Sequence, residues 1–102
     1  MNKTEFLSYG AKIHKVKLET INKEVYLREM SYAGAVACNQ CKTIYERAVV
    51  TLIYSLCDET GKNIFTMEDL DVISSTMTYN TIQEIAVKVA ELSVTTNEDL
   101  VK

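Results

Sequence analysis

The spacing of apolar and polar residues divides the chain into a short β part and a longer helical part. Residues 16–19 and 25–28 alternate apolar and polar positions, and an asparagine-containing stretch, 21–24, separates them. Period-two alternation on both sides of such a turn is typical of a β-hairpin. We therefore predict a hairpin over residues 12–30, after an arm over residues 1–11 that has no clear period.

The remaining apolar residues recur every three or four positions, which is the spacing of amphipathic helices. The pattern predicts one long helix over residues 31–57, whose first residue is a serine suited to the N-cap position. A short helix is expected over residues 67–75 and another after Thr81, over residues 82–92. Thr81 and Glu84 have the spacing of a capping box at the start of the last helix.

These elements predict a mainly α (α+β) fold, in which an N-terminal β-hairpin is followed by one long helix and two shorter helices. The single domain covers residues 12–93, with the hairpin over 12–30 and the helical part over 31–93. The polar residues 94–102 are expected to form a flexible tail.

The stretch between the long helix and the next one contains a dense helix-start signal. Thr66 is placed to cap the backbone N–H of Asp69, whose carboxylate can reach back to Thr66. Phe65 and Leu70 have the spacing of a hydrophobic staple. We therefore expect residues 58–70 to join two helices tightly.

Composition and charge narrow the classes of function. The 102 residues suffice for one domain, with 47% hydrophobic and 25% charged residues, as in ordinary globular proteins. The net charge of −3 argues against a general binder of nucleic-acid backbones. No apolar run reaches the roughly 18 residues of a membrane span, and the chain does not start with a signal-peptide core. We expect a protein of the cytoplasm that contacts neither nucleic acid nor membrane.

Cys38 and Cys41 form a C-x-x-C motif, which could indicate a redox pair or half of a zinc site. Zinc needs four ligands, and only Cys57 and His14 remain as soft candidates. Both motif cysteines fall inside the predicted long helix, on its apolar stripe, where free cysteine behaves as a small hydrophobic residue. We interpret all three cysteines as core residues rather than as metal or redox ligands.

Residues 58–69 have the length of a calcium-binding loop but not its ligands. The positions that need an oxygen ligand, a glycine and a glutamate hold Lys62, Asn63 and Asp69. The chain also lacks a Ser/His/Asp arrangement and a glycine-rich phosphate loop. We therefore predict that the protein is not an enzyme and has no catalytic residue, metal or cofactor.

The long helix has a wider apolar surface than a surface helix usually has. Ile44, Val50, Ile53 and Tyr54 extend the apolar arc towards its narrow polar stripe. The hairpin and the last helix could cover these flanks, or part of the surface could stay open for a partner. We predict partner binding at these four residues.

Three segments resemble the tail assembly chaperones of long-tailed bacteriophages and prophages. Residues 25–31 (VYLREMS) are similar to the strand and Arg-Glu-apolar-Ser step before the main helix of that family. Residues 58–70 resemble its D-E-x-G-K-x-x-F-T-x-E-D-L centre, and residues 82–93 resemble its closing amphipathic helix.

The resemblance implies a mostly α protein that binds the tape measure protein and keeps it soluble until the tail tube forms around it. It also implies a protein of the host cytoplasm that is absent from the mature virion. The tail tube protein and a second copy of the chain are further candidate partners. The alternative is a small helical, homo-oligomeric module with a regulatory or structural role.

Overall fold

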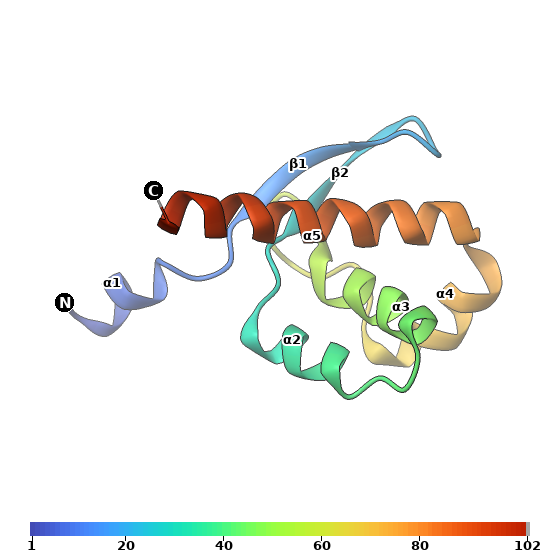
Figure 1. The fold of residues 1–102 in the computed structure, drawn as a ribbon, viewed down its shortest axis with the longest axis horizontal. Helices are drawn as coiled ribbons and strands as arrows, with labels where there is room; N and C mark the ends of the chain where they lie inside the picture. Colours follow the sequence, from blue (N-terminus) through green and yellow to red (C-terminus); the bar gives the residue numbers. More distant parts are fainter. Residues whose placement is uncertain (102) are drawn as a thin grey trace.

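The computed structural model describes residues 1–101, and side chains are described for residues 1–92. A three-stranded antiparallel sheet and the helices α3 and α5 enclose the core (Figure 1). The elements follow one another as α1 (Lys3–Leu7), β1 (Ile13–Leu18), β2 (Lys23–Arg28), α2 (Tyr32–Asn39), α3 (Ile44–Ser55), β3 (Leu56–Cys57), the 3₁₀ turn η1 (Met67–Asp69), α4 (Leu70–Thr76) and α5 (Tyr79–Val101).

The predicted hairpin is confirmed, and a third strand extends it. β1 pairs antiparallel with β2, with Val16 opposite Val25, and Asn22 in the turn has a positive φ of 53°. Asparagine tolerates this left-handed conformation better than most residues do. β3 adds two residues to the free edge of β2, where Leu56 lies opposite Leu27.

The predicted single long helix is wrong, because the chain turns back after α2. Ser31 caps α2 as expected, accepting a hydrogen bond from the Gly34 N–H at 3.1 Å. Thr43 then caps a separate helix, α3, by accepting from the Glu46 N–H at 3.1 Å. Helix α2 therefore packs beside α3 and brings Cys38 Sγ within 3.4 Å of the Thr51 hydroxyl.

The fold class is corrected accordingly to a mixed α+β fold. The described residues form a three-stranded sheet and five α-helices, where one long and two shorter helices were expected. The last helix also begins earlier than predicted, at Tyr79, because the Thr78 hydroxyl accepts from the Thr81 N–H at 3.3 Å. Thr81 is consequently a buried residue of the helix and not its cap.

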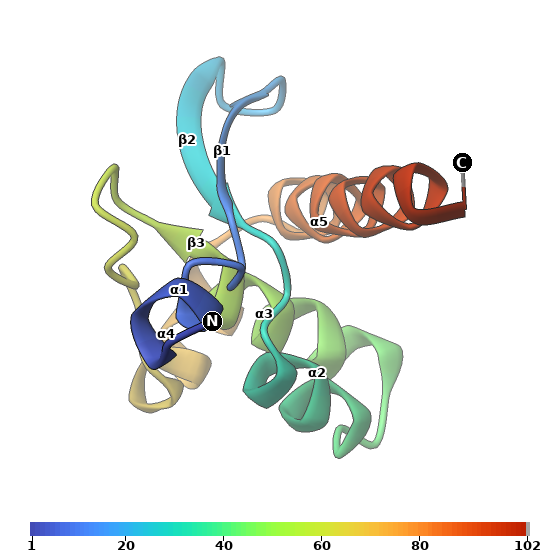
Figure 2. The same cartoon turned by 90° about the vertical axis from the view of Figure 1, so that its left-hand side faces the viewer.

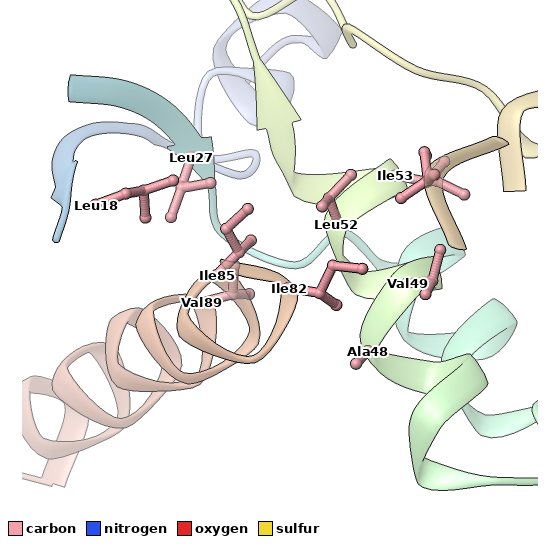
Figure 3. Close-up of a cluster of buried hydrophobic side chains, with 10 residues drawn as sticks. Leu18, Leu27, Ala48, Val49, Leu52, Ile53, Ile82, Ile85 and Val89 are labelled. Atoms are coloured by element: carbon pink, nitrogen blue, oxygen red, sulfur yellow. The ribbon is translucent and has the colours of Figure 1, made fainter. Parts of the chain in front are cut away.

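The core lies between the hairpin, α3 and α5. Figure 3 shows leucines of the hairpin facing Ile85 and Val89 of α5, with Leu52 of α3 beside them. Burial of such side chains supplies most of the folding free energy of a small domain. The core cluster consists of Leu18, Leu27, Ala48, Val49, Leu52, Ile53, Ile73, Ile82, Ile85 and Val89.

The predicted N-terminal arm and C-terminal tail are described to different extents. The arm predicted over residues 1–11 contains the short helix α1, none of whose residues is buried. The side chains of residues 94–102 lie outside the described part of the chain, so the flexible tail predicted there stays a prediction.

Candidate functional site

The structure separates the four residues that the sequence predicts as a partner-binding surface. Ile44 is 67% exposed, whereas Val50 and Ile53 are only 1% and 2% exposed, and Tyr54 is half-buried. Folding back of α2 accounts for Tyr54, because Gly34 packs closely against its Cβ. Partner binding at these residues stays a prediction, but a partner cannot reach Val50 or Ile53 while the core is closed.

A groove between α2, α3 and α5, called groove A from here on, is an apolar hollow with a volume of about 480 Å³. Four of its lining residues are alanines, whose small side chains let a helix approach the backbone closely. Ile44 and Met30 add larger apolar surface. The lining residues are Met30, Ala35, Cys38, Asn39, Ile44, Arg47, Ala48, Thr51, Gln83, Ala86, Val89 and Ala90.

Among the residues whose side chains are described, Arg47 is the one charged residue that lines groove A. Its Nε donates a hydrogen bond to the Cys38 carbonyl oxygen at 3.3 Å, near the C-terminal end of α2, where a cation is favoured by the helix dipole. This bond orients the guanidinium beside the apolar walls. An apolar groove with one arginine suits an amphipathic helix that carries a carboxylate.

A second groove, called groove B from here on, lies between the first turn of α3, α4 and the start of α5. Its volume is about 380 Å³, and its charged lining residue is Glu46. Gln83 lines both grooves, so they adjoin on the surface while their charges differ in sign. The lining residues are Tyr45, Glu46, Val49, Leu70, Ser74, Met77, Tyr79, Ile82 and Gln83.

The cysteines take positions that suit packing. Cys38 and Cys57 are buried, Cys41 is half-buried, and all three are free thiols. Burial raises the pKa of Cys41, and the nearby Glu46 raises it further, so the reactive thiolate is disfavoured. Among the described residues, no group of three or more His, Cys, Asp or Glu side chains is arranged to hold a metal ion.

The carboxylate of Asp58 stabilises the loop that follows α3 and β3. Asp58 Oδ1 accepts hydrogen bonds from the Thr60 hydroxyl at 2.6 Å, the Thr60 N–H at 2.8 Å and the Lys62 N–H at 3.0 Å. The Thr60 hydroxyl and then the Lys62 amide hold the pKa of Asp58 below its usual range. Near the end of residues 58–70, the Thr66 N–H donates to Asp69 Oδ2 at 2.9 Å, as the predicted capping arrangement requires.

A family model described as "Phage tail assembly chaperone, TAC" matches residues 6–99 of the chain. The chain belongs to the phage tail assembly chaperone family. This membership confirms the resemblance seen in the three sequence segments. Grooves A and B therefore lie on a member of a tail assembly family, and proteins of such a family are expected to bind other proteins.

The fold of the chaperone agrees with this family. A solved structure, "Structure of bacteriophage HK97 tail assembly chaperone", is similar with a TM-score of 0.64 and 13% sequence identity. The similarity covers 88% of this chain and 97% of that chain, and at this identity it shows a shared fold alone. No curated protein matches the sequence. Among the described residues, no helix is long and apolar enough to cross a membrane.

Among the four predicted partner-binding residues, only Ile44 lines groove A. The four alanines of groove A come from three helices, so no local pattern in the sequence predicts that they share a surface. Arg47 lies within the predicted long helix, and one continuous helix would not bring its side chain to the end of another helix. Only the turn between α2 and α3 places its side chain near the end of α2.

Proposed function

We propose that the chaperone binds an amphipathic helix of the tape measure protein in groove A and so keeps that protein soluble during tail assembly. The observation that supports this proposal is an open apolar groove with small walls and one arginine, on a member of a tail assembly chaperone family. The alanines admit the helix backbone, Ile44 and Met30 contact its apolar face, and Arg47 pairs with one of its carboxylates.

One groove of this size supports only a modest affinity. Several copies along an extended client would add avidity and still be displaced one by one when the tube forms. This behaviour suits a chaperone better than a permanent tail component.

We therefore propose that the chaperone acts in the host cytoplasm and is absent from the finished virion, with the tail tube protein as a further partner. Mass spectrometry of purified virions and of infected cells compares its abundance in the two, and abundant chaperone in the virion contradicts the proposal.

Co-expression with the tape measure protein of the same phage tests the groove. The variant Ile44→Glu/Ala90→Glu places two charges in groove A at exposed positions, so the domain should remain folded. We expect co-purification and the soluble fraction of the client to fall by at least about tenfold, as for loss of an interface hot spot. Val87→Glu is the matched control, because Val87 is an exposed residue of α5 outside the groove.

Two outcomes contradict the proposed function. Unchanged co-purification of the Ile44→Glu/Ala90→Glu variant places the client elsewhere on the surface. Equal loss with Val87→Glu indicates a general charge effect. Circular dichroism melting of each variant separates loss of binding from loss of folding.

A further inference from the structure

Strand β1 forms one edge of the sheet, so one side of its backbone has no neighbouring strand. The strand order is β1-β2-β3, and β1 pairs with β2 alone. In an antiparallel pair, hydrogen-bonded and non-hydrogen-bonded positions alternate along each strand. The Glu29 N–H donates to the Lys12 carbonyl oxygen, so the positions of β1 that bond to β2 are His14, Val16 and Leu18.

The N–H and C=O groups of Ile13, Lys15 and Lys17 therefore point away from β2, and we call them the free edge of β1. No hydrogen bond within the described part of the chain reaches these groups. The edge ends at Glu19, whose N–H already donates to Glu84 Oε2 at 2.7 Å. Unpaired edge groups of this kind can pair with another extended segment.

The free edge is open to a partner along the part of β1 next to the hairpin turn. Figures 1 and 2 both show this part of the hairpin rising above α5. At that height, none of the elements drawn in Figure 2 lies beside β1 on the side away from β2. The side chains of Lys15 and Lys17 are exposed, so an extended segment can lie against the edge.

The side chains along the free edge favour an acidic partner. Val16 and Leu18 pack in the core, so Lys15 and Lys17 lie on the opposite, outer face of β1. Lys15 Nζ lies 3.7 Å from Glu24 Oε1, but both side chains are more than half exposed, so this ion pair is weak. No carboxylate among the described residues forms an ion pair with Lys17.

Lysines on an edge strand commonly prevent pairing with further strands. In this protein, that protection depends on the charge of the incoming strand. A second copy of β1 would bring its own lysines next to Lys15 and Lys17, and like charges on neighbouring strands are destabilising. A strand with carboxylates at alternate positions would form cross-strand ion pairs with the two lysines instead.

We propose that an extended acidic segment of a partner protein adds to the free edge of β1 as a fourth strand. Its backbone bonds to the N–H and C=O groups of Ile13, Lys15 and Lys17, and its carboxylates lie beside the two lysines. The free edge shares no residue with groove A, so this contact is separate from client binding in that groove. A short edge with exposed ion pairs predicts a weak affinity.

A synthetic peptide in which glutamate alternates with valine tests the proposal in solution. NMR spectroscopy measures the exchange of β1 amides with water as the peptide is added to the full chain. At half-saturation, exchange at Ile13, Lys15 and Lys17 should slow about twofold, because a hydrogen-bonded amide is protected. The amides of His14 and Val16 are internal controls and should not change, since they already bond to β2.

Two matched peptides separate strand pairing from simple attraction between charges. A peptide with proline in place of valine keeps its charge but cannot form a complete ladder, so it should not slow exchange at the free edge. A peptide with lysine in place of glutamate keeps its strand propensity but loses the ion pairs. It should bind at least about tenfold more weakly than the acidic peptide.

The variant Lys15→Glu/Lys17→Glu should reverse the preference between the acidic and the basic peptide. Both lysines are exposed, so the variant should remain folded, and melting curves check this. The matched control is Lys3→Glu/Lys42→Glu, which makes the same change in net charge at exposed positions outside the sheet. This control should prefer the acidic peptide, as the parent chain does.

The groove A variant Ile44→Glu/Ala90→Glu should also bind the acidic peptide as the parent chain does. Loss of client binding in that variant therefore leaves strand addition intact, and the two proposals can fail separately.

Four results would contradict strand addition. The acidic peptide could fail to bind at millimolar concentration. It could bind without slower exchange at the three edge amides, or it could slow all β1 amides equally. The proline-containing peptide could bind as well as the valine-containing one. The variant Lys15→Glu/Lys17→Glu could keep the preference of the parent chain.

Discussion

Glu84 connects the hairpin to α5 by a set of hydrogen bonds between residues far apart in the sequence. Glu84 Oε2 accepts from the Glu19 N–H at 2.7 Å, and Oε1 accepts from the Thr20 N–H at 3.1 Å and the Thr20 hydroxyl at 2.8 Å. Thr81, one turn earlier, donates to the Thr20 hydroxyl at 3.0 Å. The hairpin turn is thus held on α5 by the two residues that the sequence suggested as a helix cap.

The carboxylate of Glu84 is expected to stabilise the fold in a pH-dependent way. The amide of Glu19 and then the amide of Thr20 hold the pKa of Glu84 below its usual range. The unfolded chain therefore binds the proton more readily than the folded one. The stabilisation is complete above the ordinary glutamate pKa of about 4.3 and is lost as the pH falls through the lower folded-state pKa.

Glu84→Gln should lower the melting temperature at neutral pH and flatten its decline below about pH 4.3. Glutamine keeps one acceptor oxygen but loses the charge that the two backbone amides stabilise. Thermal melts at a series of pH values check this, with Glu59→Gln as a control at an exposed carboxylate. An unchanged pH profile in Glu84→Gln would show that the contact does not contribute to stability.

At the scale of the elements, the turn between α2 and α3 decides which helix faces are covered. The pairing of the two helices depends on close approach at Gly34, which lies in the first turn of α2. A Cβ at this position would lie 3.1 Å from the Tyr54 Cβ and would also collide with Met30 Sδ. Glycine is therefore needed here for packing, although it lowers helix propensity.

Gly34→Ala should destabilise the domain by about 1 kcal/mol. Alanine gains roughly 1 kcal/mol of helix propensity, but overpacking of a tight contact costs roughly 1–3 kcal/mol. Urea unfolding measures the difference, and Met30→Ala should relieve part of it in a double-mutant cycle. An increase in stability would mean that α2 moves away from α3 without loss, contrary to the packing described here.

At the scale of the whole molecule, the arm over residues 1–11 is expected to contribute little to the stability of the rest of the domain. No residue of α1 is buried, whereas the core is closed by the hairpin, α3 and α5. Where the arm joins β1, the Glu29 N–H donates to the Lys12 carbonyl oxygen at 2.9 Å. Helix α1 therefore lies outside the closed core.

Removal of residues 1–10 should change the free energy of unfolding by no more than about 0.5 kcal/mol, as for changes at exposed positions. Calorimetry of the truncated and the full-length chain at the same concentration checks this expectation. A large loss of stability would show that the arm is part of the core of the domain.

The sequence by itself determined the features that are local along the chain. The alternation on both sides of Asn22 predicted the hairpin, Ser31 was correctly identified as a cap, and residues 58–70 carried the family resemblance that membership confirms. Each of these signals depends on residues a few positions apart, so a single sequence contains it in full.

Only the tertiary structure decided which apolar residues stay open. Ile44, Val50 and Ile53 all belong to the wide apolar surface predicted for the long helix, yet the fold exposes the first and buries the other two. That difference depends on a turn after Gln40, which makes α2 a cover for α3, and on α5, which supplies the far walls of both grooves. Which residues stay exposed depends on how all the elements pack together, and no local pattern in the sequence specifies that packing.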